Sequence, residues 1–332
     1  MKLKKKYGAS LLMLCLIAAC LCGLAAGSLR ITDLFQDAEN RELALTVLFK
    51  LRLPRIALAV AVGACLGVSG AGFQAVFRNA LADPFVIGSS SGAALGAGIA
   101  MMAAMGGALP VSAAAFIGSL AAVFAVLLIS RASGMPSVLN LLLAGTAISS
   151  LCSSLLSFLF ILKDGSLQRV YYWMLGSLAV PWNTALSALP VMFAGALIIF
   201  LSSSALDLLL QGDEIAESLG LDVKKARITV ILGASLASAA TVSVCGVIGF
   251  VGLIAPHSAR LFTGSIHKRL LPASALLGAL AVLLADIVSR SILPPIEIPI
   301  GIITALGGAP FFLFLLVKNS VFVKNGAIAN GG

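Results

Sequence analysis

Charge is scarce in this sequence: Asp, Glu, Lys and Arg together make up 11% of its 332 residues. Soluble domains carry about 25% charged residues. Hydrophobic residues instead make up 60% of the chain, and the mean hydropathy is +1.10. A soluble fold of this size could not hide that much apolar surface from water, so large soluble domains are excluded. Since a helix needs about 20 apolar residues to cross a bilayer, we expect one all-α, polytopic membrane domain over residues 1–332.

The residue patterns of common enzymes and metal sites are also missing. The sequence has no G-x-x-x-x-G-K-[ST] phosphate-binding loop. Neither His257 nor His267 belongs to a motif for a nucleophilic serine or for a metal ligand set. The six cysteines lie in apolar stretches without a C-x-x-C pair, which is more typical of small core residues than of a disulfide or zinc framework. We therefore predict that the chain is not an enzyme and that it has no catalytic residues, cofactor or metal.

The net charge of +9 does not indicate nucleic-acid binding, because the basic residues are scattered between apolar runs. In membrane proteins, Lys and Arg concentrate in short cytoplasmic loops. If both termini are cytoplasmic and the helices cross about ten times, 14 of the 22 basic residues fall on the cytoplasmic side. The ten predicted spans lie near residues 8–29, 55–76, 86–106, 110–130, 138–162, 187–206, 228–247, 249–262, 271–290 and 300–317.

Two stretches depart from this regular pattern. Residues 228–262 form one nearly unbroken apolar run, whose glycines and Pro256 predict a full helix followed by a shorter, broken one. Residues 165–186 contain Trp173 and Trp182, and aromatic rings of this kind anchor at head-group depth. We expect an interfacial helix and a turn there.

The amino end carries four lysines followed by an apolar run that reaches Cys20, as a lipoprotein signal peptide would. A processed lipoprotein would continue as a soluble domain, whereas further apolar segments follow here. We therefore favour an uncleaved first transmembrane helix over a processed signal.

Small residues recur at helix-packing spacing, from Gly63 to Gly67 and again at Gly88, Gly92 and Gly96. Such positions let helix backbones approach closely in lipid, so helix packing is the first expectation. A second, compatible interpretation is that the polar part of this segment lines a translocation path: Ser89, Ser90, Ser91 and Gly92.

Asp286 is the one firm acidic candidate within a predicted span, and Arg290 follows it at the i+4 position. A local ion pair would neutralise both groups, so structural pairing is favoured. The alternative is an ion-coupled secondary transporter that uses Asp286, because such carriers keep ionisable groups within the membrane. A nearly charge-free membrane interior without energy-coupling chemistry favours a partner subunit that supplies the energy.

The longest predicted cytoplasmic loop covers residues 207–227. Its apolar residues alternate with acidic ones; they are Ile215, Ala216, Leu219 and Leu221. This alternation predicts a short amphipathic helix, a break at Gly220 and then a second short element. Such a loop is either a solvated connector or a docking helix for a cytoplasmic motor subunit.

Six sequence blocks, spread in order over nearly the whole chain, carry more information than any single motif. They are RLPR (52–55), RNALADPFVIGSSSGAALGA (78–97), WMLGSL (173–178), GFVGLIAPHSARLFTG (249–264), ADIVSR (285–290) and EIPIGIITALGGAPFFLFLL (297–316). Together they resemble the FecCD family of ABC importer permeases. The resemblance implies import of iron-siderophores, haem or cobalamin across the bacterial or archaeal cytoplasmic membrane. It also implies a second permease subunit, either identical or paralogous, two cytoplasmic P-loop ATPase subunits and an extracytoplasmic substrate-binding protein. The cargo stays open.

The same resemblance implies roles for individual residues. Three arginines would face outside and pair with acidic groups of the binding protein: Arg52, Arg55 and Arg290. The alternative is that these long side chains only anchor helix ends at the membrane surface. The ATPase coupling loop would contain Asp213, Glu214, Ala216, Glu217, Leu219 and Gly220. The inner gate would contain Asn79, Ala80 and Leu81, and before the fifth helix Ser137, Val138 and Leu139.

Two further points concern the details of these blocks. Family members usually have Pro where this chain has Ala80, and loss of that fixed dihedral predicts a less rigid gate turn. Pro256 and His257 fall in the family's most recognisable block, where we expect helix termination and inner-face packing rather than ligand chemistry.

Overall fold

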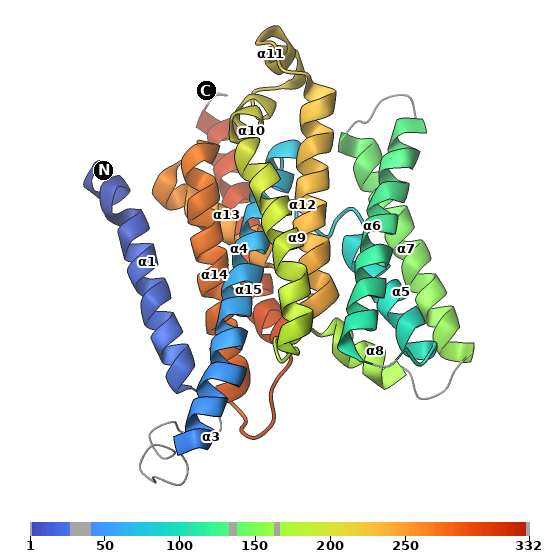
Figure 1. The fold of residues 1–332 in the computed structure, drawn as a ribbon. Coiled ribbons are helices and arrows are strands. Elements are labelled where there is room, and N and C mark those ends of the chain that lie inside the picture. The colour runs from blue at the N-terminus through green and yellow to red at the C-terminus, as the bar shows by residue number, and fades with distance from the viewer. Residues whose placement is uncertain (1, 27–40, 106, 133–137, 163–166, 330–332) are drawn as a thin grey trace.

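The computed structural model describes residues 2–26, 41–105, 107–132, 138–162 and 167–329, and every regular element in these ranges is a helix. Figure 1 shows most of them running side by side as a bundle with two ends. The helices are α1 (Lys2–Ala25), α3 (Arg41–Thr46), the π-helical η2 (Val47–Arg52), α4 (Leu53–Val76), α5 (Ser89–Met102), α6 (Ala108–Ala132), α7 (Val138–Leu162), α8 (Leu167–Met174), α9 (Trp182–Leu201), α10 (Ser203–Leu209), α11 (Asp213–Ser218), α12 (Val223–Cys245), α13 (Val251–Thr263), α14 (His267–Ser291) and α15 (Ile300–Ala329).

Within the described residues, six helical segments are long and apolar enough to cross a membrane: Arg41–Val76, Ala108–Ala132, Val138–Leu162, Trp182–Leu201, Val223–Cys245 and His267–Ser291. Two shorter apolar helical segments, Ser10–Ala25 and Ile300–Phe314, accompany them. Because the polar backbone groups of a membrane-spanning segment must be satisfied internally, helices of this kind define a multi-pass membrane protein.

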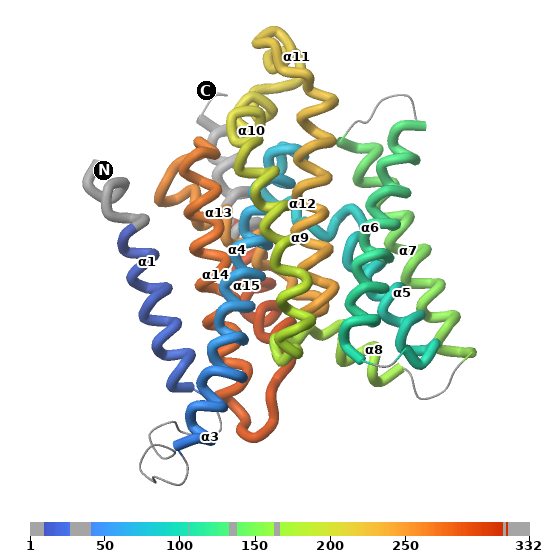
Figure 2. Tube along the Cα trace, viewed as in Figure 1, coloured from blue at the N-terminus to red at the C-terminus, as the bar shows by residue number. Residues whose placement is uncertain are grey.

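The two ends of the bundle are clearly different. Figures 1 and 2 place α11 at one end, where α1 also begins, and α3 at the opposite end. Helix α1 packs against α14, and its Leu16 and Ala19 are buried in the main apolar core. The first predicted span is therefore an integral part of the packed structure.

The predicted division of residues 228–262 into a full helix and a shorter one is confirmed. Helix α12 ends at Cys245, and the shorter α13 begins at Val251. The expectation that Pro256 terminates a helix is wrong, because α13 continues to Thr263. A proline in the second turn of a helix removes a single backbone hydrogen bond, and the following turn survives that loss here. The His257 ring packs edge-on against Phe311 of α15, with the ring centroids 6.2 Å apart.

The boundaries of the predicted sixth span need correction. The predicted span was 187–206, whereas α9 begins at Trp182 and ends at Leu201, and α10 follows as a separate helix. Pro181 lies at the N-cap of α9 with φ −54°, a dihedral that suits a helix start and brings the start forward. The short helix expected within 165–186 is present as α8.

A stretch of backbone without regular structure separates α12 from α13 and contacts the segment that follows α8. The Ser177 N–H donates to the Cys245 carbonyl (2.8 Å), and the Gly301 N–H donates to the Leu175 carbonyl (2.9 Å). A Cβ atom on Gly246 would lie 2.1 Å from the Trp173 carbonyl oxygen, so only glycine allows this approach. Irregular backbone is tolerated in a membrane protein where it is packed against other protein segments, as it is here.

The glycine spacing is confirmed as helix packing at Gly63, Gly67, Gly92 and Gly96, whereas Gly88 lies before α5 as its N-cap with φ 83°. A Cβ atom on Gly63 would lie 2.2 Å from the Gly278 carbonyl oxygen, so α4 and α14 touch through their backbones. The same approach joins α5 to α6, where a Cβ atom on Gly96 would lie 2.2 Å from the Ala114 carbonyl oxygen. Close backbone contact of this kind replaces the hydrophobic driving force that is missing between helices in lipid.

Candidate functional site

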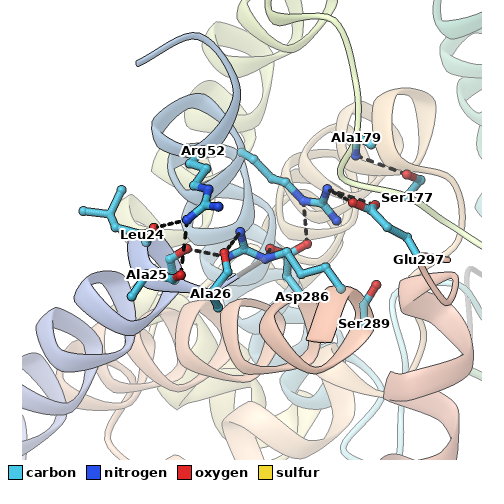
Figure 3. Close-up of polar contacts among 12 residues, drawn as sticks. Leu24, Ala25, Ala26, Arg52, Ser177, Ala179, Asp286, Ser289 and Glu297 are labelled. Carbon is cyan, nitrogen blue, oxygen red and sulfur yellow. Dashed lines mark hydrogen bonds and ion pairs between the residues drawn. The ribbon is translucent and has the colours of Figure 1, made fainter. Parts of the chain in front are cut away.

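A network of charged side chains joins α4 and α14 near the α3 end of the bundle (Figure 3). Asp286 is fully buried, and Arg55 Nε donates to its Oδ1 at 2.8 Å, while Arg290 Nε lies 3.3 Å from its Oδ2. The other end of the Arg55 guanidinium pairs with Glu297 at 2.9 Å. The predicted pairing of Asp286 with Arg290 is confirmed. The shorter contact with Arg55, 231 residues away, was missed because no local spacing shows that α4 lies against α14.

Arg52 and Arg290 are 6% exposed and donate to the last carbonyl groups of α1. Arg52 NH1 lies 3.2 Å from the Ala25 oxygen, and Arg290 donates to the Gly23 oxygen at 2.7 Å and to the Ala26 oxygen at 3.0 Å. The final carbonyls of a helix have no partner within it, and they form the negative end of its dipole. Two of the three arginines predicted to face outside and dock a binding protein are therefore nearly buried, and they hold the end of α1 in place.

A cavity of about 520 Å³ opens beside this network. Its wall contains both charged and aromatic side chains, among them Lys50, Arg55, Trp182 and Glu297. The α3 end thus presents a concave surface of mixed charge, which suits recognition of a charged partner more than burial in hydrocarbon.

The opposite end carries the short helix α11, between two glycines in the left-handed region, Gly212 (φ 118°) and Gly220 (φ 85°). The predicted short helix and the break at Gly220 are confirmed. The prediction of a second short element after Gly220 is wrong, because Asp222 caps the 23-residue helix α12. The Asp222 side chain accepts a hydrogen bond from the Lys225 N–H, which satisfies an unpaired donor at the helix start.

Helix α11 has one buried side and a larger exposed one. Ala216 is fully buried in an apolar cluster together with Phe77 at the end of α4 and Leu209 of α10. The other predicted coupling residues of this segment lie at the surface: Glu214, Glu217, Leu219 and Gly220. An exposed surface with two acids and a large apolar side chain can bind a partner without unfolding the helix.

Asp213, the first residue of α11, lies between two arginines from other parts of the chain. Arg227 of α12 contacts both carboxylate oxygens, at 2.9 and 3.0 Å, and Arg78 contacts Oδ1. Partial burial alone would raise the pKa of Asp213, but the hydrogen bond and charge of Arg227, with the charge of Arg78, hold that pKa below its ordinary value. Asp213 therefore stays ionised at neutral pH.

The predicted gate turn follows Arg78 directly. The Asn79 side chain accepts a hydrogen bond from the Leu81 N–H at 2.9 Å, and the Asn79 N–H donates to the Gln74 carbonyl at 3.1 Å. A side chain that hydrogen-bonds its own backbone two residues later stabilises a turn without proline. Asn79 and Ala80 are exposed, and Leu81 is half-buried.

The other predicted gate residues lie at the start of α7. Val138 is half-buried and packs against the apolar cluster that contains Phe77 and Ala216, whereas Leu139 is exposed. Figure 1 shows that α7 begins at the α11 end of the bundle. Ser137 lies outside the described residues.

The predicted path residues divide into two groups. Ser89 is fully buried, and a Cβ atom on Gly92 would lie 2.4 Å from the Gly118 carbonyl oxygen, so both are packing residues here. Ser90 and Ser91 are half-buried, and Ser91 Oγ donates to the Gly88 carbonyl at 3.0 Å.

A row of exposed hydroxyl groups on α7 was not predicted from the sequence. Its members recur every three or four residues along one helix: Thr146, Ser150, Ser153, Ser154 and Ser157. The spacing is visible in the sequence, but only the packing of α7 shows that this row is left uncovered by the rest of the described chain. Thr146 and Ser157 donate to the Leu143 and Ser153 carbonyls of the same helix, each at 2.9 Å, so these two donors are satisfied internally. A row of hydroxyls nevertheless suits contact with water or with another protein surface better than contact with hydrocarbon.

These features define a class: a multi-pass helical membrane protein whose two ends carry different charged surfaces joined by closely packed helices. The sequence profile of the FecCD transport family matches residues 11–318. The chain belongs to that family.

Curated relatives and solved structures agree with this assignment. The chain is 42% identical over 281 residues to the cobalamin import system permease protein of Halobacterium salinarum, covering 84% of this chain and 76% of the relative. It is 38% identical over 320 residues to the hemin transport system permease protein of Yersinia pestis, covering 94% and 95%. A solved structure described as an inward-facing conformation of a metal-chelate type ABC transporter matches with a TM-score of 0.81 and 33% identity, over 93% of this chain and 98% of that one.

Proposed function

We propose that this chain is the membrane-spanning subunit of an ATP-driven importer for metal chelates of the siderophore, haem or cobalamin type. The observation that carries the proposal is the exposed helix α11, which projects at one end and is fixed by Asp213 to the membrane helices. A pair of P-loop ATPase subunits binds this end, an extracytoplasmic substrate-binding protein binds the other, and a second permease subunit completes the path.

The proposed topology has ten crossings, with both termini in the cytoplasm. The six long apolar segments account for six of them, and α1, α5, α13 and α15 supply the remaining four. The excess of basic residues on the α11 side supports this orientation, because Lys and Arg concentrate in cytoplasmic loops.

Cargo passes, in this proposal, between two subunits along the hydroxyl row of α7, with Ser90 and Ser91 beside it. Small hydroxyl and apolar side chains bind a bulky chelate weakly, and weak binding permits release. The turn Asn79–Leu81 and the start of α7 at Val138 and Leu139 form the inner gate.

The function is tested by reconstituting the permease in vesicles with its ATPase and binding protein, and by offering a ferric siderophore, haem and cobalamin separately. We expect uptake of one of them that requires ATP and survives collapse of proton and sodium gradients. The variant Leu219→Asp should weaken ATPase binding at least about tenfold, a loss of about 1.4 kcal/mol, because it places a charge on the exposed docking surface.

The matched control is Leu293→Asp, which changes an equally exposed leucine at the other end of the bundle. Equal ATPase binding by both variants would contradict the assignment of α11 as the coupling helix. Uptake that persists without ATP and stops when an ion gradient collapses would favour the secondary-transporter alternative.

Docking of the binding protein is proposed at Arg52, Arg55 and Arg290. Arg55 gives the most direct test, because it is half-buried and does not contact α1; since it also pairs with the buried Asp286, affinity is compared only between variants that remain folded. We expect Arg55→Gln to weaken binding-protein affinity about tenfold and to reduce its salt dependence, since one complementary charge is lost. The control is Arg131→Gln, an exposed arginine at the end of α6. Unchanged affinity in a folded Arg55→Gln protein would remove Arg55 from the docking surface.

A further inference from the structure

We propose that Arg78 is a positioning residue that transmits displacement of α11 to the turn Asn79–Leu81. The inference rests on the proposed function, because it specifies how movement at the coupling helix reaches the inner gate. It is carried by a side-chain bridge between segments that lie far apart in the sequence.

The Arg78 guanidinium connects three elements. Its Nε donates to the Leu209 carbonyl at the end of α10 (2.7 Å), and its NH2 pairs with the Asp213 carboxylate at the start of α11. The residue itself follows the last turn of α4. A single planar group thus binds both sides of the short connection between α10 and α11.

The backbone at Arg78 makes the turn sensitive to the position of this side chain. Arg78 has φ 47°, a left-handed conformation that L side chains rarely adopt. Its N–H donates to the Ala75 carbonyl, and the next N–H, of Asn79, donates to the Gln74 carbonyl. These bonds close the end of α4 in the manner of a helix C-cap. Displacement of the guanidinium therefore acts directly on the residue that sets the direction of the gate turn.

Arg227 provides the fixed side of the bridge. Its side chain is 7% exposed and holds both oxygens of Asp213 from within α12, whereas the side chains of Arg78 and Asp213 are 34% and 45% exposed. Partly exposed ion pairs contribute little stability, so they can break and re-form. The Arg227 contact is better protected, because its guanidinium is nearly buried and its NH2 group reaches both Asp213 oxygens, at 2.9 and 3.0 Å. The contact with Arg78 is thus the one that can rearrange while Asp213 stays attached to α12.

The apolar contacts at the α11 end also connect α11 to the predicted gate. Ala216 of α11, Leu209 of α10 and Phe77 just before Arg78 belong to one buried cluster, and Val138 at the start of α7 packs against it. Because packed cores move between discrete arrangements rather than deforming continuously, a shift of α11 is shared with both parts of the predicted gate.

The test uses the full permease with its ATPase subunits and reads the gate without cargo. In a background where the six native cysteines are replaced, Leu81→Cys is labelled with a maleimide, first without nucleotide and then with ATP and vanadate. In the parent protein we expect the two labelling rates to differ. Coupling between separate sites commonly changes an equilibrium by 5- to 150-fold, and we expect Arg78→Gln to reduce the nucleotide-dependent difference about tenfold. ATPase binding and basal hydrolysis should be retained.

Three further variants separate transmission from simple loss of structure. Arg78→Lys, which keeps one positive charge, should restore part of the response. Asp213→Asn should reduce the response as well. The double variant Arg78→Gln with Asp213→Asn should be no worse than the more damaging single change, since both changes remove the same Arg78–Asp213 ion pair. The control is Lys268→Gln, which removes an exposed positive charge from the first turn of α14.

A full nucleotide-dependent response in Arg78→Gln, or losses that multiply in the double variant, would overturn the proposal. If Arg78→Gln does not fold, Arg78→Lys and Asp213→Asn still decide, because both must show a reduced response. A parent protein that binds no ATPase would instead refute the proposed function, which makes the two failures distinguishable.

Discussion

Asp286→Asn is expected to lower the free energy of unfolding by about 3–5 kcal/mol, the cost typical of removing one partner from a buried ion pair. The substitution leaves Arg55 and Arg290 facing each other around an uncharged, fully buried side chain. Thermal unfolding of the purified protein in detergent measures the change as a fall in the apparent melting temperature.

Glu297→Gln is the matched control for this experiment. Glu297 pairs with the same Arg55, but its side chain is 45% exposed. An exposed pair contributes about 0–1 kcal/mol, so its removal should change the melting temperature little. Equal stability of Asp286→Asn and the parent would refute the structural role. ATP-independent uptake that disappears in a stable Asp286→Asn protein would revive the proton-relay alternative.

Gly63→Ala is expected to destabilise the protein by about 3 kcal/mol, the upper part of the range for overpacked cores. Its new Cβ atom would lie 2.2 Å from the Gly278 carbonyl oxygen and 2.7 Å from the Ala279 Cα atom. Both are backbone atoms, so no side-chain rotation relieves the clash, and α4 must separate from α14. The yield of monodisperse protein and its apparent melting temperature should both fall.

The same substitution at Gly307 provides the control. Gly307 lies within α15, and an added Cβ atom would meet no other atom within 4 Å. Alanine favours a helix over glycine by about 1 kcal/mol, so Gly307→Ala should be neutral or slightly stabilising. A Gly63→Ala protein as stable as Gly307→Ala would contradict the close contact between α4 and α14.

Composition and spacing predicted much of the fold because both report local physics. Long apolar runs identified the membrane helices, and the glycines of 228–262 predicted the break between α12 and α13. The start of α9 was misplaced because Pro181 was treated as part of an interfacial turn. Pro256 was wrongly predicted to end a helix, since the loss of one backbone N–H does not end α13, which continues to Thr263.

The candidate site shows where local reasoning ends. The Asp286 and Arg290 pair follows from i+4 spacing, but the contact of Asp286 with Arg55 depends on how α4 and α14 cross. The bridge from Arg78 to Asp213 likewise joins residues 135 positions apart. The arginine roles implied by the family resemblance were assigned by position alone, and they could not show that Arg52 and Arg290 also hold the carbonyl end of α1.

The two glycines beside α11 have a consequence for how such transporters diversify. A six-residue helix set between Gly212 and Gly220 touches the membrane part of the chain mainly through Asp213 and the buried Ala216. Its outward-facing positions can therefore be exchanged without repacking the bundle. Recognition of one motor protein rather than another can evolve in these few positions while the membrane part stays unchanged.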